Sequence, residues 1–156
     1  MGLPGPQGAP GAPGPTGPSG IVAATSFVPA PPSAGVEWVC EFGVTDDERL
    51  DVQTGERALI TGQATVGGGG SQGNPSFSFA VAWREVGDDT NGNLGHIVQT
   101  QGSSNPNDRY SVHVTELTPP LDAGTYEFGI CVQGTTDFTA GTGRQYGTVL
   151  LINSGS

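Results

Sequence analysis

The N-terminal segment GLPGPQGAPGAPGPTGPSG, residues 2–20, has a glycine at every third position and proline at many of the positions between. The repeated glycines are Gly2, Gly5, Gly8, Gly11, Gly14, Gly17 and Gly20. Three polyproline-II-like chains wind about one axis only where every third side chain is absent, because only glycine fits at the crowded centre. The segment therefore predicts a three-chain helix with these glycines at its axis, and the C-terminal part of the chain must accommodate two further copies.

This collagen-like repeat is short, since it contains only six complete Gly-X-Y triplets. A triple helix has no hydrogen bonds within a chain and no hydrophobic core, so a short one does not offset the entropy lost in ordering three chains. We therefore expect the remainder of the chain to hold the three copies together. Met1 stands directly before the first triplet, and we interpret the repeat as the end of a longer natural stalk.

The distribution of charge separates the repeat from the C-terminal part of the chain. All fifteen acidic residues and all five arginines lie at or beyond Glu37, so residues 1–36 carry no charged side chain. We predict a collagen-like segment over 1–20, a neck over 21–35 and a β-sandwich head over 36–156. Prolines in the neck favour an extended connector. Its apolar residues either pack near the threefold axis or begin the first strand, and the sequence leaves both alternatives open.

The acidic composition limits the partners of the head. A net charge of −10 argues against nucleic acid or an anionic membrane surface as a partner. No apolar stretch approaches the ~20 residues that a membrane-spanning helix needs, so no membrane insertion is expected.

Apolar residues alternate with polar ones in several short segments after Val36, which is the pattern of half-buried strands. Gly, Pro, Asn and Asp clusters separate these segments, as in antiparallel sandwiches and jelly rolls. We therefore predict an all-β fold, an antiparallel β-sandwich or jelly roll. The best core candidates are the aromatic residues of the alternating segments: Trp38, Phe77, Phe79, Trp83, Tyr126 and Phe128. The stretch GGGGS, residues 67–71, reads either as a native flexible loop or as an inserted linker.

The order of repeat, neck and all-β head resembles collagen-containing proteins with complement-like or tumour-necrosis-factor-like jelly-roll heads. Two stretches, RLDVQTGERALITGQATV (49–66) and LTPPLDAGTYEFGICV (117–132), look like strands and loops of such heads in bacterial and phage collagen-like proteins. The resemblance implies a compact homotrimer at the tip of a stalk.

Catalytic chemistry has little support in the residues. His96 and His113 are the only histidines, and neither lies beside a nucleophile motif such as G-x-S-x-G. His113 alternates with two valines, so we expect it on the outer side of its strand. Phosphate-binding, dinucleotide-binding and zinc-binding motifs are missing too. We predict a protein that is not an enzyme and has no cofactor.

The segment DDTNGNLG raises the question of a calcium site, with Asp88, Asp89, Asn91 and Asn93 as weak candidate ligands. Counted from Asp89, an EF-hand loop needs glycine at its sixth position and glutamate at its twelfth, where this chain has Leu94 and Thr100. The pair Asn91-Gly92 suits a two-residue hairpin turn better, and we predict no metal site.

Cys40 and Cys131 both fall on predicted strands. In a chain of extracellular type, two cysteines suggest a disulfide. Against this, Cys40 alternates with the aromatic residues of its strand, whereas Cys131 alternates with Glu127, Gly129 and Gln133 rather than with Phe128 and Ile130. A disulfide and two buried thiols both remain open.

Together these features predict a structural and adhesive protein outside the cell or on a virion, whose main partner is itself. The head would trimerise and register a collagen-like stalk on a bacterial surface fibre or phage tail. The alternative is a lectin-like head, with or without calcium, that binds a surface glycan or protein receptor through its exposed loops.

Overall fold

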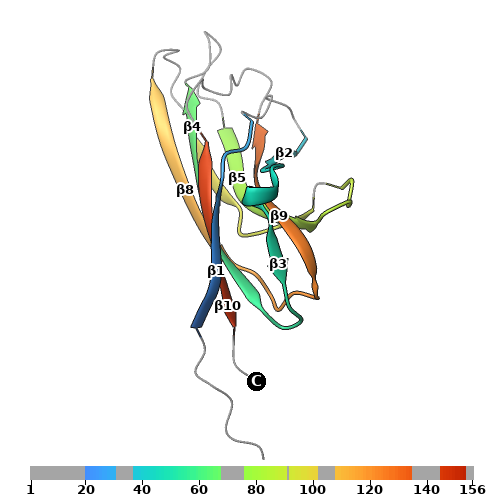
Figure 1. The fold of residues 1–156 in the computed structure, drawn as a ribbon. Helices are drawn as coiled ribbons and strands as arrows, with labels where there is room; N and C mark the ends of the chain where they lie inside the picture. The colour runs from blue at the N-terminus through green and yellow to red at the C-terminus, as the bar shows by residue number, and fades with distance from the viewer. Residues whose placement is uncertain are drawn as a thin grey trace, which may run out of the picture.

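The computed structural model describes residues 20–30, 37–67, 76–90, 92–101, 108–134 and 145–153. These residues form two antiparallel sheets packed face to face (Figure 1). The strands are β1 (Gly20–Phe27), β2 (Val39–Phe42), β3 (Leu50–Val52), β4 (Arg57–Gly67), β5 (Ser76–Glu85), β6 (Asn93–Leu94), β7 (Val98–Gln101), β8 (Arg109–Leu117), β9 (Gly124–Gly134) and β10 (Tyr146–Asn153), with one 3-10 turn, η1 (Asp46–Glu48). Within these ranges, no helix has the length and apolar character needed to cross a bilayer. The repeat before Gly20 lies outside the described residues.

The strands are wound into a sandwich of nested pairs. One sheet has the order β1-β10-β4-β8, and the other has β2-β9-β5-β6, with β3 also on β9 and β7 also on β5. Thus β1 pairs with β10, β2 with β9, β4 with β8, and β5 with β6 and β7. This nesting of early strands with late ones is jelly-roll winding. The predicted all-β antiparallel sandwich is confirmed.

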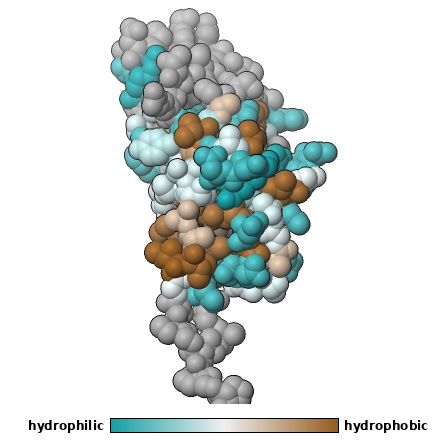
Figure 2. Space-filling model, viewed as in Figure 1, coloured by the Kyte–Doolittle hydropathy of each residue, from teal (hydrophilic) through white to brown (hydrophobic). Residues whose placement is uncertain are grey.

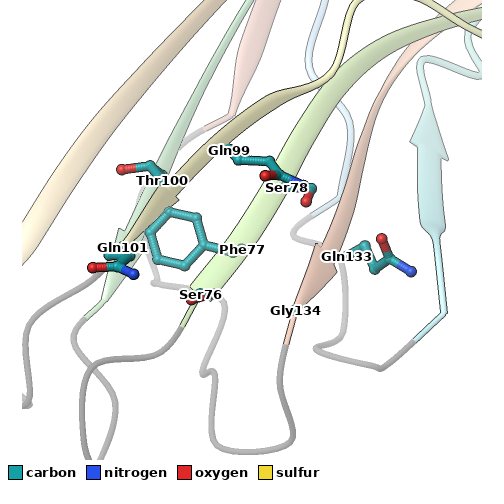
Figure 3. Close-up of a pocket in the computed structure, with 8 residues that line it drawn as sticks. All are labelled: Ser76, Phe77, Ser78, Gln99, Thr100, Gln101, Gln133 and Gly134. Atoms are coloured by element: carbon teal, nitrogen blue, oxygen red, sulfur yellow. The ribbon is translucent and has the colours of Figure 1, made fainter.

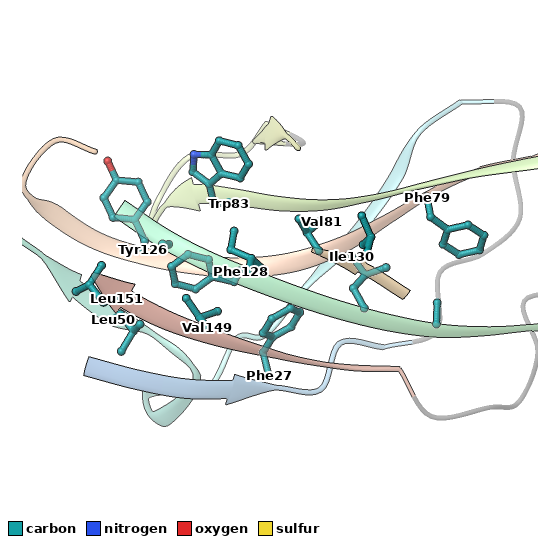
Figure 4. Close-up of a cluster of buried hydrophobic side chains, with 14 of the residues drawn as sticks. Phe27, Leu50, Phe79, Val81, Trp83, Tyr126, Phe128, Ile130, Val149 and Leu151 are labelled. Carbon is teal, nitrogen blue, oxygen red and sulfur yellow. The ribbon is translucent and has the colours of Figure 1, made fainter. Parts of the chain in front are cut away.

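The main core lies between the sheets and follows the period-two pattern of the sequence (Figure 4). Alternate residues of β5 and β9 point inward, and so do those of β4 and β10. The buried side chains include Phe77, Phe79, Val81, Trp83, Tyr126, Phe128, Ile130, Ile60, Val149 and Leu151. Five of the six predicted aromatic core residues are therefore in this core.

Trp38 is the exception, and the inward orientation predicted for its strand is wrong. It is only partly buried, on the outer side of the six-stranded sheet, where it packs with Phe42 and Cys40 against a second apolar cluster. Ala80 and Ala82 of β5 are fully buried members of this cluster. The centre of this sheet is thus apolar on both faces, so alternation alone did not identify which side of β2 faces the core.

The head begins earlier in the chain than predicted. Residues 20–27, predicted as part of the stalk end and the neck, form β1 and pair with β10 from Gly20↔Asn153 to Phe27↔Gly147. Phe27 is fully buried, and a Cβ at position 147 would clash with its ring. Glycine at 147 therefore makes room for the aromatic side chain that anchors β1 in the core. The second alternative for the neck is the one that the structure shows.

Further hydrogen bonds tie β1 to the η1 turn. The Thr25 hydroxyl donates to the carbonyl of Asp47 at 2.6 Å, and the Val28 N–H donates to the Glu48 carboxylate at 2.8 Å. The same carboxylate accepts from the hydroxyl and the N–H of Thr45 at 2.6 and 3.0 Å. These bonds lower the pKa of Glu48, and the bond from the Thr45 hydroxyl has the largest effect. The strand that follows the repeat is therefore attached both to β10 and to the η1 turn between β2 and β3.

The lowered pKa of Glu48 predicts a pH-dependent contribution to stability. A carboxyl whose pKa falls on folding stabilises the native state at pH values above its ordinary pKa, here 4.5. This stabilisation is lost as the pH falls through the pKa of the folded state. We expect Glu48→Gln to destabilise the protein at neutral pH, and the difference from the wild type to shrink at about pH 3. Urea unfolding at both pH values measures this. An equal loss of stability by Glu48→Gln at both pH values would contradict the role given to the Glu48 carboxylate. Glu37→Gln, at an exposed position before β2, is the control.

Truncation of a central core ring should be costly. Phe128 is fully buried between the sheets, so we expect Phe128→Ala to lower the free energy of unfolding by about 3–5 kcal/mol. Val44→Ala is the control, because Val44 is 64% exposed. Denaturant unfolding tests both, and a loss of less than ~1 kcal/mol for Phe128→Ala would contradict the core described above.

Candidate functional site

An apolar surface covers one end of the outer side of the four-stranded sheet. Strand register places Ile21 opposite Ile152, and Ala24 opposite Leu150. Leu150 in turn lies opposite Leu59, which lies opposite Leu117. We call these six residues, Ile21, Ala24, Leu59, Leu117, Leu150 and Ile152, the basal apolar face. Ile21 is 64% exposed and Leu117 is 39% exposed, so large aliphatic side chains face outward here.

The basal apolar face lies where β1 begins and β10 ends, directly after the Gly-X-Y repeat in the sequence. Figure 2 shows hydrophobic surface gathered at this end of the head. Val22, at the register shift between Ile21 and Ala23, adds a further half-exposed aliphatic side chain. A contiguous apolar group at one end of a small head indicates an interface rather than scattered surface residues.

The rest of this sheet surface is polar in its described residues. Beyond the basal apolar face come a row of hydroxyl residues and then Tyr146, Gln63 and His113, with a hydrogen bond from the Tyr146 hydroxyl to Gln63. Among the described residues that point outward from β1, β10, β4 and β8, none is Asp or Glu. In a chain with fifteen acidic residues, the described part of this face presents no acidic side chain to a second copy.

The two histidines do not form a catalytic arrangement with nearby acids. His113 is exposed on β8 opposite Gln63, on the outer side as predicted. The backbone N–H of His96 donates to Glu116 at 2.9 Å. Over the part of the chain that the structure describes, no group of three or more His, Cys, Asp or Glu side chains could hold a metal ion.

The candidate calcium residues are placed in the β5–β6 connection. The Asp88 carboxylate accepts from the N–H and the hydroxyl of Thr90, both at 2.9 Å, and these bonds lower the pKa of Asp88. Asp89 is exposed beside it, Asn93 begins β6, and Asn91 lies outside the described residues. The predicted two-residue hairpin is wrong, because Asn93 at the start of β6 pairs with Trp83 rather than with Thr90.

A pocket of about 570 Å³ lies on the other sheet, at the start of β5 and the end of β9 (Figure 3). Gln99, Ser78 and Gln133 are directly opposed across β7, β5 and β9 and form one row of its lining. Ser76 lies opposite Gln101 in the next row, and Phe77, Thr100 and Gly134 complete the lining. None of the described residues of this lining is ionisable. Sequence reasoning missed the pocket, because its side chains come from three strands far apart in the chain.

The row beside the pocket carries the two cysteines. Cys40 and Cys131 are directly opposed on β2 and β9, next to Ala80 of β5, and form a disulfide in the structure. The alternation of apolar residues in the sequence argues against this disulfide only if Cys40 faces the core, together with the aromatic residues of its strand. Both cysteines instead face the second cluster on the outer side, where Trp38 packs.

Charged groups on this outer side lie at the other end of β5. Glu127 is 4% exposed and accepts from Arg84 at 2.6 Å and from Arg49 at 3.4 Å. The Arg84 guanidinium also lies 4.0 Å from the centre of the Phe42 ring. One end of the surface therefore carries charges that pair with one another, whereas the described lining of the pocket at the other end carries none.

Comparison with known proteins names no family. No protein-family model matches the chain, and no curated protein is similar in sequence. Among solved structures, the chain is similar to a carbohydrate-binding module of Cellvibrio mixtus lichenase 5A in complex with cellotriose. Identity is 13%, the match covers 86% of this chain and 89% of that one, and the TM-score is 0.26. A TM-score this low shows no close correspondence between the two chains.

The disulfide gives a direct prediction. Thiol titration of the unfolded, unreduced protein should find no free thiol. Because the bond closes a loop with a sequence separation of 91, a Cys40→Ser/Cys131→Ser variant should lose up to about 4.5 kcal/mol of stability. Two reactive thiols in the unreduced wild type would contradict the structure.

Proposed function

We propose that this chain is the homotrimeric head of a collagen-like stalk, displayed outside the cell on a bacterial fibre or on a phage tail. Its role is structural and adhesive rather than enzymatic. The head holds three chains together and sets their register, so that the stalk winds from its C-terminal end. The basal apolar face, located directly after the repeat, is the observation that supports this proposal.

The position of β1 connects the repeat to this face. A collagen helix brings three chains side by side about one axis, and the last repeated glycine, Gly20, is also the first residue of β1. If the repeat is triple-helical, three β1 strands start next to one another. The exposed Ile21 and Val22 would then be buried between copies, with a gain of roughly 25 cal/mol per Å² of apolar surface removed from water.

Charge limits the surfaces on which copies can meet. Three heads that each carry a net charge of −10 repel one another unless they meet on a surface without acids. The outward surface of the four-stranded sheet meets this condition in its described residues, and its arginine beside the apolar group, Arg57, donates to the carbonyl of Thr118 at 2.7 Å.

Strand β1 also couples the head to the stalk. Phe27 is buried in the core and β1 pairs with β10 as far as Gly20, so the head holds the start of each β1 at a defined position. Three tethered chains also have a high effective concentration, which replaces the stability that six triplets lack.

A single charge on the basal apolar face tests the proposal. Leu150 points outward, so Leu150→Glu should leave the fold intact while it places three carboxylates at the interface between copies. We expect loss of the trimer by light scattering and loss of the collagen-type circular dichroism signal, with unchanged near-ultraviolet circular dichroism of the head. Val44→Glu, at an exposed position off both sheets, is the matched control. A Leu150→Glu protein that keeps both the trimer and the collagen signal would overturn the proposal.

A further inference from the structure

We propose that the pocket between β5, β7 and β9 binds a neutral, polyhydroxylated ligand, a carbohydrate, and that it does so without a metal ion. The lining of the pocket, its geometry and its place on the head support this assignment. It goes beyond the trimeric role, which concerns the opposite sheet.

Most side chains of the described lining are amides and hydroxyls. Three of the eight glutamines in the sequence, Gln99, Gln101 and Gln133, line the pocket together with Ser76 and Ser78. Each glutamine amide has both donor and acceptor atoms, and so does each serine hydroxyl. Sugar hydroxyls also donate and accept hydrogen bonds, so this lining matches them. A charged ligand, in contrast, would lose its hydration on binding and would find no opposite charge among the described lining residues.

The polar groups are arranged in a row of fixed spacing. Gln99, Ser78 and Gln133 face the same side of three neighbouring strands, which lie about 4.8 Å apart in a sheet. The row therefore spans about 10 Å on a rigid scaffold. An extended ligand with hydroxyls along its length can contact all three side chains at once, whereas a small ion cannot.

Apolar surface accompanies this row. Phe77 also belongs to the lining, but its side chain points into the core between the sheets, on the opposite face of β5 from Ser76 and Ser78. Trp38 precedes Cys40 by two residues, and it packs partly exposed against the cluster beside the Gln133 end of the row. Ligand sites combine apolar walls with a few polar groups and have volumes of ~300–1,000 Å³, and the pocket volume of about 570 Å³ lies in this range.

The position of the pocket suits a head that meets its ligand at the tip of a stalk. It lies on the sheet opposite the basal apolar face, near the start of β5 and the end of β9, whereas β1 begins at the other end (Figure 1). Association through the four-stranded sheet would leave the pocket open to solvent. Three weak sites on one trimer would then act together on a surface with many copies of the ligand.

The test uses the full chain on an array of neutral, sialylated and sulfated oligosaccharides, followed by calorimetry with a neutral oligosaccharide that binds. We expect binding to neutral oligosaccharides, unchanged by EDTA. A Gln99→Ala/Gln133→Ala variant should bind about tenfold more weakly or worse, because two hydrogen-bonding side chains are lost. Gln53→Ala, at an exposed glutamine before β4, is the matched control and should bind as the wild type does.

Solution mass and melting temperature of each variant show whether it still folds and assembles, which separates a failure of this inference from a failure of the trimeric role. Binding only to charged oligosaccharides, binding abolished by EDTA, no binding to any neutral oligosaccharide, or equal binding by the double variant and the wild type would each overturn the inference.

Discussion

Strand β1 pairs with β10 from the last repeated glycine onward, and the arrangement of the head depends on this pairing. Phe27 lies fully buried at one end of β1, against Gly147. At the other end, Ile21 faces outward beside Ile152. Without β1, β10 would become an edge strand that pairs only with β4, and the core would lose a phenylalanine. The strand therefore belongs to the core of the head and, at the same time, is the continuation of the repeat.

The two outer surfaces of the sandwich differ in chemistry, and this difference separates the two proposed roles. The four-stranded sheet presents aliphatic residues at its base and no described carboxylate, which suits contact between copies of an acidic chain. On the six-stranded sheet, Glu127 is paired with Arg84 and Arg49 at one end, and a pocket with no charged residue in its described lining lies at the other. Self-association and ligand binding would therefore not compete for the same surface.

Much of the sandwich could be predicted from alternation, because β4, β5, β9 and β10 each turn every second residue toward the main core between the sheets. The boundary at Gly20 could not, since Ala23, Ala24, Thr25 and Ser26 are small residues without a clear apolar period. The outer position of Trp38 could not be predicted either, because the small residues Ala80 and Ala82 make the second face of the sheet apolar. The basal apolar face and the pocket depend on strand register, which a single sequence does not show.

The central claim is that the head assembles by itself and organises the repeat. Sedimentation equilibrium of residues 20–156, which keep β1 but lack the triplets before it, tests this claim most directly. The account predicts a mass of three chains at micromolar concentration, with the folded head unchanged in circular dichroism. A folded monomer would contradict it, and would mean that the stalk brings the heads together instead.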